Sequence, residues 1–295
     1  MQGRLTAVDD TDQPAGSTVT RHRYGSDESQ YGELYLPTGP RRPGTVIVIH
    51  GGFWKARYGA DLGAPLAADL AARGWAAWNL EYRRVGNGGG WPNTLADVAA
   101  GIDLLADLDS ADAELSSADV DLSSSDADLG SSGNQSPELD LHRVVAVGHS
   151  AGGHLAAWAA ARPGLPAGTV GAAPRVRLTG VIAQAGVLDL IQGAADDLGD
   201  SAVPRLLGGR PDEVPEPYQL ASPLHRLPLD VPVRCLHARD DDTVPFSQSV
   251  DYVRAARAAG DDADVVEVTG GHFAVIDPAA PAWQAALELL PDLLG

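Results

Sequence analysis

The residues Gly148–Gly152 form a Gly-x-Ser-x-Gly pattern, which is the part of this sequence best suited to chemistry. A β-branched run precedes it and an Ala-rich run follows, so the chain is expected to turn there from a strand into a helix. A serine on such a sharp turn projects its hydroxyl from the edge of a sheet, and the flanking glycines leave room for the turn. The pattern predicts Ser150 as a nucleophile, with the N–H of Ala151 at the start of a helix facing a developing oxyanion.

A second set of backbone donors is predicted directly after the apolar run Thr45–Ile49, where the sequence reads His-Gly-Gly-Phe-Trp. A Gly-Gly turn at the C-terminal end of a buried strand can point its N–H groups inward and complete an oxyanion hole. We therefore expect donors from Gly51, Gly52 and Phe53. A plain strand-ending turn is the alternative.

Two later strand ends supply an acid and a base, in the order Ser, Asp, His along the chain. Asp240, Asp241 and Asp242 follow the strand pattern that begins at Val233 and precede a Val-Pro pair. His272 follows the last strand pattern in a Gly-Gly turn, from which an imidazole can reach the serine. The residues alone leave the choice among the three aspartates open.

Together these motifs resemble the α/β-hydrolase superfamily over roughly residues 30–290. The pentapeptide HGGFW is similar to that of the kynurenine (aryl) formamidases and of the esterases related to hormone-sensitive lipase. The resemblance implies an α/β fold with a mostly parallel sheet, helices on both faces and a small or absent cap. It also implies a triad of Ser150, Asp241 and His272, because the family pattern D-x-x-V-P matches when read from Asp241.

Two positions depart from that family pattern. Phe53 stands where the esterases have a third glycine, which bears on the geometry of the oxyanion loop. Ala238 stands where a glycine often follows the histidine of the penultimate strand. That histidine, His237, carries no motif of its own, and we interpret it as structural or exposed.

Strand and helix patterns alternate along the chain, so the strands should be mostly parallel and the site should lie at their C-terminal ends. The chain is expected to form one domain over residues 20–295, after a flexible tail at 1–19. Strands are expected at 31–36, 45–49, 75–82, 178–185 and 265–268, and helices at 60–73, 246–259 and 279–294.

Residues 107–137 interrupt this alternation with an Asp/Ser-rich stretch that has no basic residue. Such a composition predicts a solvated, low-complexity insertion. It joins the end of a helix to the start of the strand before Ser150, so it should emerge at the edge opposite the site. A lid over the site is the alternative.

Composition sets the remaining expectations. The formal charge of −19 disfavours nucleic acid and anionic membranes as partners. The single cysteine, Cys235, allows no internal disulfide, and the absence of an apolar leader predicts a cytoplasmic protein. We expect no metal site, because no spacing of His, Cys and Asp fits one. The oligomeric state stays open, a homodimer included.

Four side chains near the strand ends are candidates for substrate contacts: Trp54, His149, Trp91 and Asp189. For Trp54, packing in the core is an equal alternative. For His149, beside the nucleophile, a packed residue with its hydrogen bonds satisfied is the alternative. The segment 186–228 is long enough for a small cap only, with Leu190, Leu206 and Leu207 as further lining.

The predicted mechanism is two-step acyl transfer through an acyl-enzyme, which needs no cofactor. The leading function is hydrolysis of a small carboxylic ester, with an aryl-formamidase as the close alternative. A catalytically inactive hydrolase fold that serves as a ligand receptor is the third interpretation.

Overall fold

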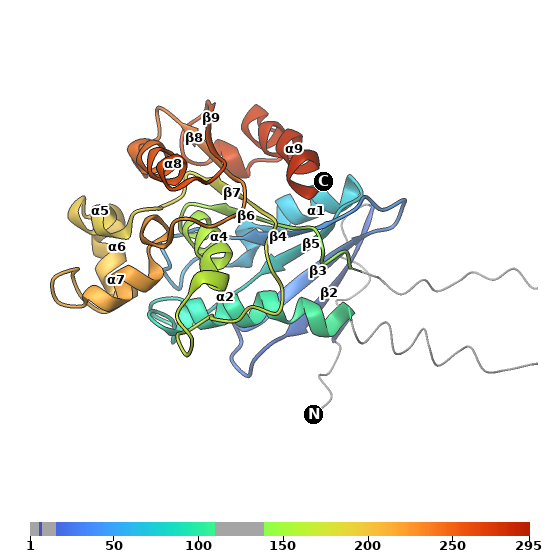
Figure 1. Ribbon diagram of the computed structural model, residues 1–295. Helices are drawn as coiled ribbons and strands as arrows, with labels where there is room; N and C mark the ends of the chain where they lie inside the picture. Colours follow the sequence, from blue (N-terminus) through green and yellow to red (C-terminus); the bar gives the residue numbers. More distant parts are fainter. Residues whose placement is uncertain (1–5, 8–15, 110–138) are drawn as a thin grey trace, which may run out of the picture.

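The structure is a computed structural model, and it describes residues 6–7, 16–109 and 139–295. Within these residues one sheet has the strand order β1-β2-β3-β5-β4-β6-β7-β8-β9 (Figure 1). The strands are β1 (Thr6–Ala7), β2 (Ser17–Arg23), β3 (Tyr31–Pro37), β4 (Thr45–Ile49), β5 (Ala76–Leu80), β6 (Val144–His149), β7 (Gly180–Gln184), β8 (Val233–Ala238) and β9 (Ala263–Val268).

Strands β1, β2 and β3 pair antiparallel with their neighbours, and β3 also runs antiparallel to β5. From β5 through β9 every pairing is parallel. The expectation of a mostly parallel α/β sheet is therefore confirmed. Its C-terminal edge gathers the loops that follow β4, β6, β8 and β9.

Helices cover both faces of the sheet (Figure 1). The α-helices are α1 (Ala64–Ala72), α2 (Asn93–Asp103), α4 (Ala151–Ala161), α5 (Leu190–Ala195), α6 (Leu198–Leu207), α7 (Pro215–Ala221), α8 (Ser247–Ala259) and α9 (Pro281–Leu294). Short 3₁₀ helices are η1 (Ala60–Leu62), η2 (Arg162–Gly164), η3 (Pro223–Arg226) and η4 (Ala274–Ile276).

The side chains of strand β4 belong alternately to two hydrophobic clusters, one on each face of the sheet. Ile47 and Ile49 belong to the cluster packed against α2, α4 and α8, whereas Val46 and Val48 belong to the one against α1 and α9. Successive side chains of a strand point to opposite faces, so a strand buried on both faces must be apolar throughout.

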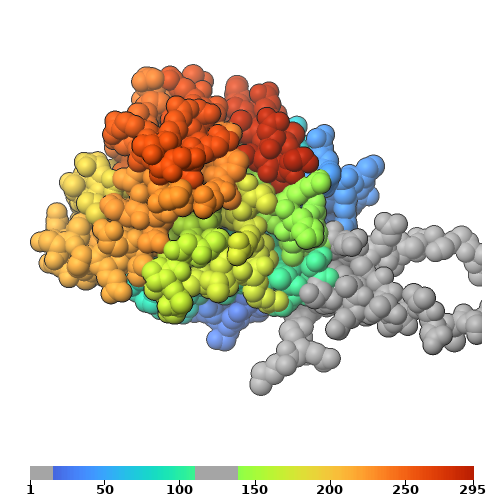
Figure 2. All heavy atoms as spheres, in the orientation of Figure 1, coloured from blue at the N-terminus to red at the C-terminus, as the bar shows by residue number. Residues whose placement is uncertain are grey.

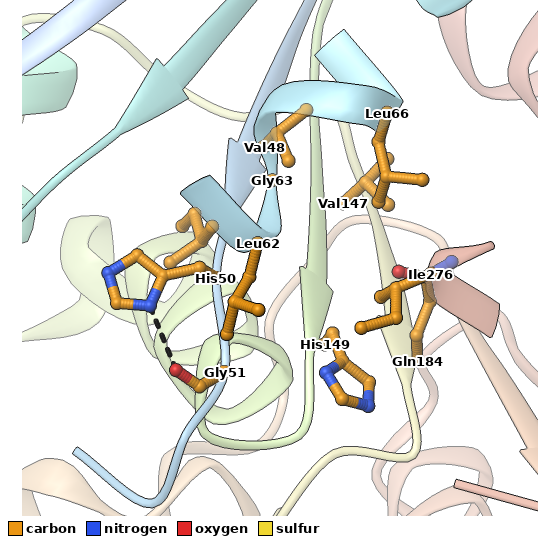
Figure 3. Close-up of a pocket in the computed structure, with 11 residues that line it drawn as sticks. Val48, His50, Gly51, Leu62, Gly63, Leu66, Val147, His149, Gln184 and Ile276 are labelled. Carbon is orange, nitrogen blue, oxygen red and sulfur yellow. Dashed lines mark hydrogen bonds between the residues drawn. The ribbon is translucent and has the colours of Figure 1, made fainter. Parts of the chain in front are cut away.

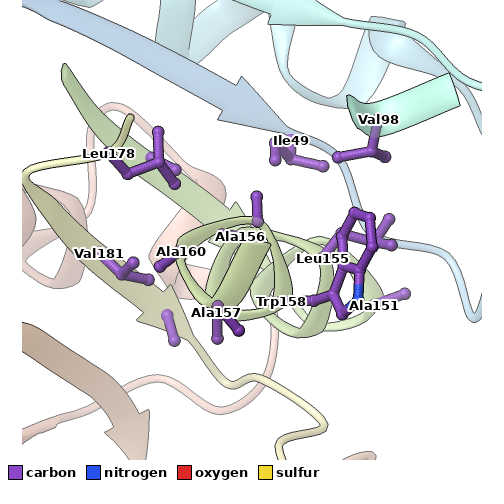
Figure 4. Close-up of a cluster of buried hydrophobic side chains, with 14 of the residues drawn as sticks. Ile49, Val98, Ala151, Leu155, Ala156, Ala157, Trp158, Ala160, Leu178 and Val181 are labelled. Atoms are coloured by element: carbon purple, nitrogen blue, oxygen red, sulfur yellow. The ribbon is translucent and has the colours of Figure 1, made fainter. Parts of the chain in front are cut away.

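Helix α4 is buried along its whole length, which explains its alanines. Small side chains such as Ala156 and Ala160 let the helix lie close to the sheet, while Trp158 and Leu155 fill the space toward Ile49 and Val98 (Figure 4). This packing fixes the N-terminus of α4, and with it the residue before the helix.

The predicted N-terminal tail extends too far along the chain. Strand β2 begins at Ser17, inside the predicted tail of residues 1–19, and Thr6–Ala7 pair with its Thr20 and Arg21. The expected helix at 60–73 is divided into η1 and α1. No helix in the described ranges is long and apolar enough to cross a membrane.

The predicted insertion also begins later than expected, because residues 105–109 are helical and Asp107 pairs with Arg175. Residues 110–138 lie outside the described residues. The two chain ends that flank them meet, since Asp109 accepts a hydrogen bond from the N–H of Leu139 at 3.2 Å. Asp140 in turn accepts one from the N–H of Gly44, directly before β4. Both ends therefore lie at the N-terminal edge of the sheet.

Replacing residues 110–138 with a Gly/Ser linker of about six residues is expected to preserve the fold, because the flanking residues already meet. Each halving of loop length recovers about 0.6 kcal/mol of closure entropy, so the free energy of unfolding should rise by about 1 kcal/mol. Urea denaturation measures the change. A large loss of stability would show that the segment packs on the domain.

Candidate active site

Ser150 lies at the turn from β6 to α4 in a strained conformation, with φ 54° and ψ −116°. A Cβ on Gly148 would lie 2.1 Å from the carbonyl oxygen of Gly152, and one on Gly152 would lie 2.0 Å from that of Ile49. The turn therefore requires both glycines. The N–H of Ser150 donates to the carbonyl of Gln184 at 2.7 Å, which ties the turn to the end of β7.

An acid–base pair forms from the loops after β8 and β9. Nδ1 of His272 lies 2.7 Å from Oδ2 of Asp241, and both side chains are almost fully buried. The other carboxylate oxygen of Asp241 accepts the N–H groups of Thr243 and Val244 at 2.8 and 2.9 Å. Asp242 is exposed and accepts the hydroxyl of Thr243 instead. The structure thus brings Asp241, of the three aspartates, onto His272.

The environment keeps Asp241 ionised. Burial raises the pKa of this carboxyl, but hydrogen bonds from His237, His272 and two backbone N–H groups outweigh burial and hold the pKa well below its usual range. A carboxylate in this position orients the imidazole of His272 and stabilises it when it gains a proton.

His149, predicted to contact substrate, instead supports the loop of His272. Its Nε2–H donates to the carbonyl oxygen of His272 at 2.9 Å, and the two rings lie 4.6 Å apart between centroids. Burial, followed by the nearby His272, lowers the pKa of His149 to about 3, so this ring is neutral near pH 7. Figure 3 shows its other side against a small cavity that Leu62, Leu66 and Ile276 help to line.

The loop after β4 lies against the turn of Ser150. A Cβ on Gly51 would lie 3.1 Å from Cβ of Ser150, so only glycine lets the two backbones approach. In the described part of the chain, the N–H groups of Gly52 and Phe53 donate to no backbone oxygen. Ala151 opens α4, so its N–H has no partner within the helix. These donors are available for an oxyanion.

Phe53 adopts a left-handed backbone conformation, with φ 50°, and Trp54 follows with φ 53°. This is the position where the resemblance leads one to expect glycine, and such strain costs about 1–3 kcal/mol per residue. Packing offsets the strain, since the ring of Phe53 lies against Gly199 and Lys55 donates to the carbonyl of Gly199 at 2.7 Å.

A buried polar network supports the same loop, and its acid, Glu81, was not predicted from the sequence. Nδ1 of His50 lies 2.8 Å from the carbonyl oxygen of Gly51 (Figure 3). Nε2 of the same ring lies 3.1 Å from Oε1 of Glu81. Glu81 also contacts Arg84, and the hydroxyl of Tyr82 donates to the carbonyl of His50 at 2.8 Å. The one signal in the sequence was an acid at the end of an apolar strand.

Three other predicted substrate contacts lie elsewhere. Trp54 is fully buried and packs edge-on against His154, which confirms the alternative prediction that it packs in the core. Trp91 is partly buried, and its backbone N–H donates to the carbonyl of Leu206 at 2.6 Å. Asp189 caps α5 by accepting the N–H groups that begin the helix. Core packing thus accounts for Trp54 and helix capping for Asp189, while the substrate contact of Trp91 stays a prediction.

The segment 186–228 forms α5, α6, α7 and η3, which gather at one side of the molecule (Figures 1 and 2). Leu190, Leu206 and Leu207, expected as lining, are buried in the core instead. Over residues 16–109 and 139–295, no group of three or more His, Cys, Asp or Glu could hold a metal ion.

Comparisons with known proteins agree with this architecture. A family model described as BD-FAE matches residues 134–255, and a search of curated proteins finds no match. A truncated carbohydrate esterase from gut microbiota aligns with a TM-score of 0.74 at 22% identity, over 97% of this chain and 98% of that one.

Two further solved structures are similar. Esterase B of Lactobacillus rhamnosis, inhibited by a tributyrin phosphonate, aligns with a TM-score of 0.73 at 22% identity, over 96% of this chain and 87% of that one. Esterase 2 of Thermogutta terrifontis, phosphoramylated by tabun, aligns with a TM-score of 0.65 at 21% identity, over 97% of this chain and 97% of that one. The chain therefore has the α/β-hydrolase fold.

Proposed function

We propose that this protein is a serine hydrolase that cleaves small carboxylic esters. The observation that carries the proposal is the pairing of His272 with the ionised Asp241, together with a serine on a strained strand–helix turn at the same edge of the sheet. The BD-FAE match, the esterases among the similar structures, and the inhibitor adducts of two of them support it.

In the proposed first step, Nε2 of His272 takes the proton of the Ser150 hydroxyl as Oγ attacks the ester carbonyl carbon. The N–H groups of Ala151 and of the Gly52–Phe53 peptide region bind the oxyanion that forms. Removing one such donor typically costs about 10²–10³ in turnover. His272 then protonates the leaving alcohol, the C–O bond breaks, and the acyl group stays on Ser150.

In the second step a water molecule takes the place of the alcohol. His272 removes a proton from the water, the resulting hydroxide attacks the acyl carbon, and the tetrahedral intermediate expels Ser150, which regains its proton from His272. The step consumes one water and releases one acid, with the side chains returned to their starting state.

Phe273 bears on the preferred leaving group. Its ring is 65% exposed, and it lies edge-on to His272 with 5.1 Å between the ring centroids. Because His272 protonates the leaving group, we expect an apolar surface next to its ring to contact that group as it departs. An aryl or other apolar leaving group would bury the ring. The same observation favours the second candidate, an aryl-formamidase, whose leaving group is an arylamine.

A panel of substrates tests this function and separates the two candidates. We expect p-nitrophenyl and naphthyl esters of short acids to be hydrolysed faster than the matching methyl esters. Hydrolysis of N-formylkynurenine faster than any of these esters, in the same assay, would favour the aryl-formamidase. Failure to hydrolyse any ester or formamide would leave the receptor interpretation in place.

Replacing Phe273 with alanine is expected to lower kcat/KM for naphthyl acetate about threefold to tenfold, the value of one aromatic contact. The value for methyl acetate should change little, because its leaving group is too small to cover the ring. Val250, the other exposed large apolar residue in the described ranges, provides the matched control as Val250→Ala. Equal losses for both substrates would contradict the contact.

A further inference from the structure

Asp241 has a second buried histidine partner, His237, near the end of β8. Nε2 of His237 lies 3.3 Å from Oδ2 of Asp241, the same oxygen that contacts His272 at 2.7 Å. The side chains of His237 and Asp241 are both 0% exposed. The carboxylate is therefore shared between two imidazoles, one on β8 and one in the loop after β9.

The neighbours of His237 determine which of its nitrogens carries the proton. Nε2 lies 3.0 Å from the carbonyl oxygen of Val244, which can only accept, so Nε2 is protonated and donates. Nδ1 lies 2.8 Å from the hydroxyl of Ser249, so a neutral ring accepts the Ser249 proton there. The Nε2–H thus points at Val244 and Asp241 together, and Phe246 packs against the ring edge with 5.5 Å between centroids.

We propose that His237 is a positioning residue for the reaction, with the Val244 carbonyl selecting its tautomer and the Ser249 hydroxyl holding the ring in place, so that Asp241 presents Oδ2 to His272 with part of its charge already neutralised. This inference rests on the proposed function. The hydrogen bond from His237 counts among the interactions that hold the pKa of Asp241 down.

The direction of the effect follows from charge. Without the Nε2–H donor, Oδ2 of Asp241 carries more negative charge and attracts the Nδ1 proton of His272 more strongly. The protonated form of His272 is then favoured, and the acid limb of the kcat/KM profile moves to higher pH. The carboxylate also loses one of the contacts that fix its rotamer, so kcat should fall while KM stays nearly constant.

Few other titratable groups face this pair. His272 is faced by His149, which burial keeps neutral, by Asp241 and by the ring of Phe273. Asp241 is otherwise faced by the two imidazoles and two backbone N–H groups described above. Arg239 is exposed over Phe246 and paired with Glu267, so it remains charged throughout the range tested.

The variants to compare are His237→Leu, which removes the donor, and His237→Gln, whose amide nitrogen reaches the place of Nε2. Ser249→Ala removes the hydrogen bond to Nδ1 but leaves the ring and its Nε2–H. We expect His237→Leu to lower kcat about tenfold or more, the value of one hydrogen bond to a charged group. His237→Gln should recover most of that loss, and Ser249→Ala should fall between them.

The deciding readouts are the pH profile of kcat/KM and the NMR titration of His272, assigned with His272→Ala. The acid limb and the titration midpoint should both move to higher pH in His237→Leu and return in His237→Gln. Equal profiles in all variants, with only a lower melting temperature, would reduce His237 to a packing residue. If His237→Leu does not fold, His237→Phe, which keeps a planar ring without a donor, takes its place in the same comparison.

The NMR titration also separates this inference from the proposed function, because it needs no turnover. A shifted midpoint in a protein that hydrolyses nothing would retain the role of His237 and reject the hydrolase. An unshifted midpoint in an active hydrolase would retain the proposed function and reject the role of His237.

Discussion

Asp241→Asn is expected to lower kcat about 10⁴-fold while the protein stays folded, as the loss of a triad aspartate typically does. The amide offers an N–H where His272 requires an acceptor for its Nδ1 proton. The tautomer protonated at Nε2 is then favoured, and Nε2 can no longer accept the proton of Ser150. Steady-state kinetics with a p-nitrophenyl ester measures the change.

Asp242→Asn is the matched control. This neighbour is exposed and contacts the hydroxyl of Thr243, so its replacement should change kcat less than about twofold. Similar losses in the two variants would mean that the carboxylate that orients His272 had been assigned to the wrong residue.

Gly152→Ala is expected to lower the free energy of unfolding by at least about 3 kcal/mol, because the new Cβ would lie 2.0 Å from the carbonyl oxygen of Ile49. That oxygen is backbone at the centre of the sheet, so neither strand β4 nor helix α4 can yield without losing pairing. Urea denaturation followed by circular dichroism measures the loss.

Gly164→Ala provides the comparison for that substitution, because a Cβ at Gly164 meets nothing within 4 Å. It should leave the unfolding free energy within about 0.5 kcal/mol of the parent. If Gly152→Ala were equally mild, the requirement for glycine at the turn would be wrong.

The sequence predicted best the features that depend on backbone space. Glycine at 148 and 152 and the apolar run of β4 imply a turn and a buried strand, whatever the rest of the chain does. The convergence of the loops after β4, β6, β8 and β9 followed from the parallel order of the strands. The choice of Asp241 needed the family pattern, because three adjacent aspartates look alike from the residues alone.

Side-chain roles were predicted less well. The aromatic ring of Trp54 could have served a pocket or a core, and only its complete burial decides for the core. Glu81 and His237 stood in apolar strands without a motif, and their partners come from distant parts of the chain. The first three residues of strand β2 fell inside the predicted tail because that stretch of the chain is polar, as an antiparallel strand near a sheet edge permits.

The most direct test of the serine hydrolase assignment is labelling with a fluorophosphonate, followed by intact mass and peptide mapping. Ser150 is the residue expected to carry the label, with one adduct per chain, and Ser150→Ala should remain folded and unlabelled. The labelling rate should fall in step with activity in Asp241→Asn. Labelling at another residue, or a folded Ser150→Ala that still hydrolyses esters, would contradict the account.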